Sequence, residues 1–241
     1  MKLLVETRFD YPQYTQAEVA RCVGVARNTI RDWCSLPVSE NGSKPLCNVP
    51  LVTRISPDKP YPETIPFIGM AEAVVMTSLF KGCQSTKRLR PAIETVIAEL
   101  DIKHPHASKR FHTAGAEIIY DYDKHCSTNG SDSSPTRLVE FRDGQHVFVD
   151  EVAHELETIQ YHTDGYPSQL RLPGYPNAKV IANPAVCGGQ PIFSHGIGYR
   201  VCDVVSLFRV GEPIEKVAKE YPVPIPYIQE ALRVEIQAAH R

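Results

Sequence analysis

Apolar residues recur with a helical period in residues 14–33, which read YTQAEVARCVGVARNTIRDW. This spacing predicts two short helices joined by a tight turn. In the first helix Val19 and Ala20 face inward, and the small side chain of Ala20 leaves room for a second helix to pass close by. The second helix takes its apolar side from Val25, Ile30 and Trp33.

Local signals mark the ends of these helices. Thr15 is placed to cap the first helix, and Glu18, three residues later, completes a capping box. Gly24 falls at the turn, where glycine takes a left-handed backbone without strain. Two helices joined in this way form the unit that places one helix in the major groove of DNA.

The positions outside the apolar stripes form a polar face. We expect Arg27, Asn28 and Thr29 to face bases, because such side chains reach base edges in the major groove. Arg31 and Arg21 would hold phosphates. The full set expected at DNA is Thr15, Gln16, Arg21, Arg27, Asn28, Thr29 and Arg31. The alternative is an ordinary helical hairpin within a core, which would not call for this polar face.

The next segment combines a loop with two further helices. Residues 36–66 are rich in Pro, Ser and Asn and contain LVTRI (51–55), which predicts a short strand. Residues 68–80 are apolar around most of a helical circumference, which predicts a buried helix. Another helix is expected over residues 85–100. Its basic cluster is either a second phosphate-contacting patch or a solvated helix face, and consists of Lys87, Arg88 and Arg90.

The middle of the chain is strand-like. Residues 118–122 predict a strand, and residues 123–137 are polar and predict a mobile loop or linker. Residues 138–149 predict a hairpin around Asp143-Gly144, followed by a short helix over 150–157. A second turn at Asp164-Gly165 separates strands at 158–161 and 169–172. The sequence shows no internal repeat.

The last third predicts two strands and three helices. The strands, 179–182 and 190–193, flank Asn183-Pro184 and Gly188-Gly189. The first helix ends at Gly211, a favoured residue at helix C-termini. The other two begin at Pro213 and Pro226.

Together these elements predict an α+β protein. We expect a helical, winged helix-turn-helix DNA-binding domain, short β-hairpins in the middle and a C-terminal domain of two strands and three helices. The expected divisions are 1–122 for the DNA-binding region, 123–137 for the linker, 138–176 for the hairpin-rich region and 177–241 for the C-terminal domain.

Charge and cysteine content add modest support. The net charge is −2, with a balance of +4 over residues 1–110 and −6 over residues 111–241. A basic front and an acidic rear suit a DNA-contacting portion followed by one that meets another partner. Seven scattered cysteines without a C-x-x-C pair, no apolar run long enough to span a bilayer and no signal peptide predict a cytoplasmic protein with reduced thiols.

No constellation of residues predicts catalysis. The histidines at 104, 106 and 112 precede an expected strand, and His125-Cys126 and His154 lack the ligand spacing of a metal site. Cys187 and Cys202 have no neighbouring base. We therefore expect no enzyme activity, no metal and no cofactor.

The C-terminal segment resembles a widespread bacterial family of small antitoxin domains. The matching elements are Asn183-Pro184, Gly188-Gly189-Gln190-Pro191-Ile192, Gly211-Glu212 and Tyr221-Pro222. The family has Gly-Thr-Arg-Ile at one turn, whereas this chain has Gly196-Ile197-Gly198, so the role of that arginine is not carried over.

The whole chain resembles the longer VapB-type antitoxins, in which a MerR-like helix-turn-helix precedes this domain. The pattern T-x-x-E-V-A-R-x-x-G-V-x-x-x-T-I-R-x-W in residues 15–33 carries that likeness. It implies a homodimeric autorepressor that binds operator DNA and neutralises a PIN-like ribonuclease toxin. The alternative is a stand-alone regulator in which residues 111–175 sense a small ligand.

Overall fold

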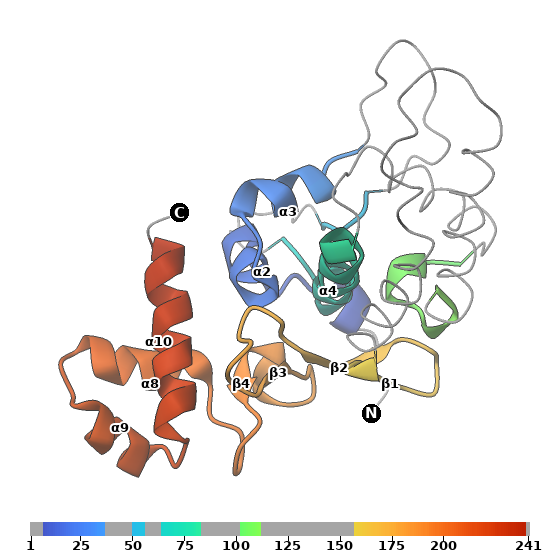
Figure 1. Cartoon of the computed structure of the whole chain (residues 1–241). Helices are drawn as coiled ribbons and strands as arrows, with labels where there is room; N and C mark the ends of the chain where they lie inside the picture. The colour runs from blue at the N-terminus through green and yellow to red at the C-terminus, as the bar shows by residue number, and fades with distance from the viewer. Residues whose placement is uncertain (1–6, 37–49, 56–63, 83–101, 112–156, 240–241) are drawn as a thin grey trace, which may run out of the picture. The chain divides into compact units, whose positions relative to one another are not determined.

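The computed structural model describes residues 7–36, 50–55, 64–82, 102–111 and 157–239, and these form the α+β fold expected from the sequence (Figure 1). Its longer helices are α2 (Gln16–Val23), α3 (Arg27–Trp33), α4 (Phe67–Gly82), α8 (Val201–Arg209), α9 (Ile214–Glu220) and α10 (Ile225–Ala239). Its strands are β1 (Gln160–Tyr161), β2 (Pro167–Arg171), β3 (Val180–Ala182) and β4 (Ile192–Phe193). Two short 3₁₀ helices are η2 (Pro105–Ala107) and η4 (Cys187–Gly189). No helix among the described residues is both long and apolar enough to cross a membrane.

The chain divides into two compact units. The first combines Met1–Ser35, Pro50–Val74 and Ser168–Arg241, and the second combines Leu36–Val49 and Val75–Pro167. The two predicted DNA-binding helices and the C-terminal segment therefore belong to one unit, although the sequence led us to expect them in separate segments.

The predicted helix pair is confirmed. The hydroxyl oxygen of Thr15 accepts a hydrogen bond from the Glu18 N–H, and the Glu18 carboxylate accepts one from the Thr15 N–H. Gly24 ends α2 in the left-handed region with a φ of 79°. Ile30 and Trp33 of α3 are buried as expected.

Helix α4 is also confirmed, and every described side chain from Phe67 to Leu79 is buried. The strand expected over residues 51–55 was wrong, because the backbone there bends. Its N–H groups find other acceptors: Val52 donates to the Trp33 carbonyl, and Ile55 donates to the Thr64 carbonyl.

The strands lie in one sheet in the order β1-β2-β3-β4. β2 pairs antiparallel with β3, with Leu170 opposite Ala182, and β3 pairs antiparallel with β4, with Val180 opposite Phe193. These strands confirm the predictions for 158–161, 169–172, 179–182 and 190–193; three are shorter than predicted, and β2 begins two residues earlier and ends one residue earlier. The predicted turn between β1 and β2 is present, since Gly165 has a φ of 80°.

The three C-terminal helices are confirmed as well. Gly211 follows α8 with a φ of 99°, and Pro213 occupies the N-cap of α9. α10 begins one residue before Pro226. Three predicted elements lie outside the described residues: the helix over 85–100, the strand over 118–122 and the hairpin over 138–149. Nearly all of the helix expected over 150–157 also lies outside them.

The turn between β2 and β3 lies directly against the end of α2. The Gly174 N–H donates to the Cys22 carbonyl oxygen at 2.8 Å. A Cβ atom at Gly174 would lie only 2.0 Å from the Arg21 carbonyl oxygen. Nearby, the Tyr14 hydroxyl donates to the Gly189 carbonyl at 2.6 Å. A close backbone contact at Gly174 and a hydrogen bond from the Tyr14 side chain thus join α2 and the residue before it to residues 168–241 within this unit.

We expect Gly174→Ala to lower the free energy of unfolding by about 3 kcal/mol, because the methyl group would overpack against α2. Gly188→Ala is the control: its φ is 59° but open space surrounds it, so only the left-handed backbone cost of about 1 kcal/mol applies. Urea unfolding of both variants measures the difference. Equal losses would contradict the close approach at Gly174.

Candidate nucleic-acid interface

The buried side chains of α3 determine which way its polar side chains point. Ala26 precedes the helix, and its carbonyl accepts hydrogen bonds from the Thr29 and Ile30 N–H groups at 3.0 and 3.4 Å. Ile30 and Trp33 are 0% and 2% exposed, which fixes the rotation of α3 about its axis. Because residues three and four apart share a helix face, the remaining positions point away from this core.

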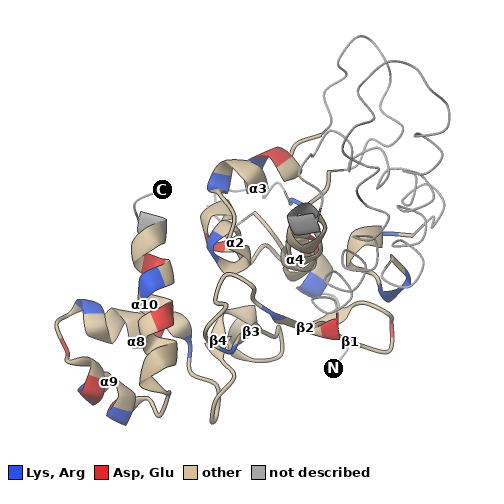
Figure 2. Ribbon diagram, in the orientation of Figure 1, with Lys and Arg blue, Asp and Glu red and all other residues tan. Residues whose placement is uncertain are grey.

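Four of the predicted DNA-contacting residues lie on α3. Arg27, Asn28 and Arg31 are exposed, and Thr29 is half-buried. Figure 2 shows that α3 carries both signs of charge. The acidic contribution is Asp32, whose carboxylate lies 3.6 Å from the Arg31 guanidinium, with the two side chains 72% and 62% exposed. An ion pair this exposed contributes little, so it restrains Arg31 weakly.

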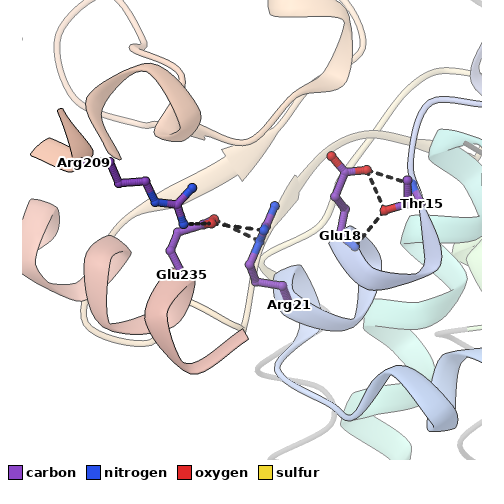
Figure 3. Close-up of polar contacts among 5 residues, drawn as sticks. All are labelled: Thr15, Glu18, Arg21, Arg209 and Glu235. Carbon is purple, nitrogen blue, oxygen red and sulfur yellow. Dashed lines mark hydrogen bonds and ion pairs between the residues drawn. The ribbon is translucent and has the colours of Figure 1, made fainter. Parts of the chain in front are cut away.

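Thr15 and Gln16, also predicted at DNA, lie at the start of α2 and are half-buried. The Thr15 hydroxyl donates to Glu18 Oε2 at 2.9 Å in addition to its capping role (Figure 3). This side chain is therefore held in place by the helix that it begins.

Arg21 makes a contact that the sequence did not predict. Its Nε lies 3.0 Å from Glu235 Oε1, and its Nη1 donates to Glu235 Oε2 at 3.1 Å. Arg209 reaches the same carboxylate from α8, with Nη2 3.3 Å from Oε2 (Figure 3). The Glu235 side chain is only 10% exposed. A residue expected to hold phosphate thus also links α2 to α10.

Two thiols near this surface, the buried Cys22 and the half-buried Cys34, are poor nucleophiles and metal ligands. Burial raises the pKa of Cys22 to about 12, and burial likewise raises the pKa of Cys34 to about 12. Both thiols therefore stay protonated at neutral pH.

The described residues hold no group of three or more His, Cys, Asp or Glu side chains that could bind a metal ion. His106, considered above as a ligand, is buried and its ring lies 5.7 Å from that of Phe111. The patch Lys87, Arg88 and Arg90 lies outside the described residues, as do His112, His125 and Cys126.

We expect Glu235→Gln to lower the free energy of unfolding by about 2 kcal/mol, because two guanidinium groups lose a charged hydrogen-bond acceptor. Asp203→Asn is the matched control, since Asp203 pairs with Arg200 in the open, with side chains 34% and 46% exposed. The control should cost about 0.5 kcal/mol or less in the same urea unfolding experiment. Equal costs would mean that the Glu235 cluster adds no more than a surface ion pair.

Comparison with known proteins agrees with this geometry. A family model described as "Putative DNA-binding HTH domain" matches residues 12–93. The chain is 32% identical over 230 residues to a Mycobacterium tuberculosis protein named "Putative antitoxin VapB45", with 95% of each chain covered. It is also similar to the crystal structure of Rv2018 from the same organism, with 28% identity, a TM-score of 0.70 and coverage of 93% of this chain and 99% of the other. The protein therefore belongs to the VapB-type antitoxins and carries an N-terminal helix-turn-helix DNA-binding domain.

Proposed function

We propose that this antitoxin represses its own operator by placing α3 in the major groove. The observation that carries the proposal is the division of α3 into two faces. Ile30 and Trp33 anchor the helix in the core, while Arg27, Asn28 and Arg31 remain exposed. Helix-turn-helix proteins read bases from the N-terminal part of such a second helix.

Each exposed residue has a distinct chemical role in this proposal. Arg27 can donate two hydrogen bonds to guanine O6 and N7, and Asn28 can pair with adenine N6 and N7. Thr29 adds a hydroxyl and a methyl group near them, and Arg31 holds phosphate. A phosphate at Arg21 would have to compete with Glu235 for the guanidinium.

We further propose that the repressor acts as a homodimer. A dimer with twofold symmetry would present one α3 to each half-site of a palindromic operator, with the half-sites about 34 Å or a multiple of it apart. The −2 net charge of the chain argues against nonspecific coating of DNA and suits recognition through a local surface.

We also propose that the C-terminal segment, residues 177–241, neutralises a PIN-like ribonuclease toxin. The name of the mycobacterial relative supports an antitoxin role, and residues 177–241 carry the segment that resembles small antitoxin domains. The toxin gene is expected beside that of the antitoxin.

Arg27→Ala and Asn28→Ala should each weaken binding to the operator by about 1–3 kcal/mol, because each loses hydrogen bonds to a base edge. Arg31→Ala should lower affinity for every duplex alike. Fluorescence anisotropy with a promoter fragment and a shuffled duplex separates these effects. Lys219→Ala, which removes an exposed positive charge from α9, is the control. Unchanged operator affinity in Arg27→Ala and Asn28→Ala would remove α3 as the reading helix.

Co-expression with the product of the adjacent reading frame tests the antitoxin half. The expected result is co-purification of the two proteins and restored growth of cells in which that product alone is toxic. A toxic neighbour that neither binds this protein nor is silenced by it would refute the proposed pairing.

A further inference from the structure

Helices α9 and α10 repeat the helix-turn-helix of α2 and α3 at a constant separation in the sequence. Gln16 opens α2 and Ile214 opens α9, while Arg27 opens α3 and Ile225 opens α10, a separation of 198 residues in both cases. From the sequence we expected no internal repeat, and the positions of these helices correct that expectation.

The hydrogen bonds at the start of each second helix obey the same separation. The Ala26 carbonyl accepts from the Thr29 and Ile30 N–H groups, and the Pro224 carbonyl accepts from the Tyr227 and Ile228 N–H groups at 2.8 and 3.2 Å. The positions at which the two units are identical are apolar: Val19 and Val217, Ala20 and Ala218, Val25 and Val223, Ile30 and Ile228. Of these, Val19, Val217, Ile30 and Ile228 are all 0% exposed. The helix pairs α2–α3 and α9–α10 therefore share the core of a helix-turn-helix.

The outer face of α10 differs from that of α3. Ile225 and Pro226 stand where the first unit has Arg27 and Asn28. Neither side chain has a hydrogen-bonding group, so the start of α10 lacks the base-reading groups that Arg27 and Asn28 would supply on α3.

Instead, the three C-terminal helices form an open apolar groove of about 650 Å³. Its apolar lining comes from all three C-terminal helices and comprises Phe208, Ile214, Leu232 and Ile236. Phe208 and Ile236 are 38% and 54% exposed. Large apolar side chains that gather at a surface in this way mark an interaction site more often than isolated ones do.

On α8 and α10, two ion pairs beside this groove present their arginines to solvent, whereas on α9 Glu215 is exposed beside Ile214. Arg233, which lines the groove, is 45% exposed, whereas its partner Glu230 is 4% exposed. Arg209, adjacent in sequence to Phe208, is 56% exposed, whereas Glu235 is 10% exposed. These two guanidinium groups are therefore more exposed than their carboxylates, so the edge of the groove formed by α8 and α10 is cationic.

We propose that this groove is the toxin-binding site, and that it takes an amphipathic helix of the toxin with acidic residues beside its apolar stripe. The inference rests on the proposed antitoxin function and adds the surface and the chemistry of the partner. An apolar groove bounded by helices is the usual receptor for such a helix. The cationic edge supplies charge complementarity for acidic flanks. A duplex would meet Ile225 and Pro226 where α3 offers Arg27 and Asn28.

The test uses the full-length protein and the toxic product of the adjacent reading frame. Ile236→Glu places a carboxylate in the groove at a half-exposed position, and we expect it to weaken toxin binding about tenfold or more. Ile197→Glu is the matched control, because Ile197 is 83% exposed between β4 and α8 and outside the groove lining. Phe208→Ala probes the groove from a second helix. Melting temperatures and calorimetric titration are measured for all four proteins, and added salt should weaken wild-type binding.

Each outcome has a distinct reading. Loss of binding in Ile236→Glu or Phe208→Ala at an unchanged melting temperature, with wild-type binding in Ile197→Glu, supports the proposal. Wild-type toxin affinity in both folded groove variants overturns it while leaving the antitoxin function intact. Loss of operator affinity or of the dimer by these variants, with toxin affinity retained, would assign the groove to DNA or to a second copy instead. If the wild-type protein does not bind the toxin, the proposed function itself fails.

Discussion

The contact on which this arrangement depends is the seating of α2 against the C-terminal segment. Gly174 approaches the last turn of α2 so closely that a single methyl group would meet the Arg21 carbonyl at 2.0 Å. On α2, the Arg21 guanidinium meets a carboxylate of α10 that is almost fully covered. A close backbone approach and a covered ion pair are both intolerant of small shifts, because neither can relax without losing hydrogen bonds. The helix pair that contains α3, the proposed reading helix, therefore rests on a core to which residues 14–33 and 168–241 both contribute.

Features that depend on neighbouring residues could be predicted from the sequence. The capping box of Thr15 and Glu18 and the left-handed Gly24 are determined within a few residues, and all of them are present. The burial of α4 followed from its apolar circumference. The exposure of Arg27 and Asn28 followed from helical periodicity once Ile30 and Trp33 were assigned to the core.

Features that depend on distant partners could not be predicted. Arg21 and Glu235 are separated by 214 residues. The residues next to Arg21 in the sequence do not distinguish an arginine that pairs with a carboxylate from one that binds phosphate. Residues 51–55 have the composition of a strand, but their N–H groups bond to the end of α3 and to Thr64, so no strand forms. The repeat of α2–α3 in α9–α10 is hard to recognise in the sequence, because a helix-turn-helix core needs only a few apolar residues at set positions. At the outer positions Arg27 and Ile225 have nothing in common.

The helix pairs α2–α3 and α9–α10 share core positions and differ at outer positions, as is expected if one scaffold serves the two partners proposed for it. The core positions fix the angle between two helices, and the outer positions decide what the second helix meets. At the start of α3 those positions are Arg27 and Asn28, which suit base edges; at the start of α10 they are Ile225 and Pro226, and the apolar groove lies further along that helix. Glu235 and Ile236 are neighbours on α10, and the first holds Arg21 while the second lines the groove. A partner bound in the groove would therefore contact the same turn of α10 that holds α2. If binding of that partner changed the affinity for DNA, binding of DNA would change the affinity for the partner by the same factor.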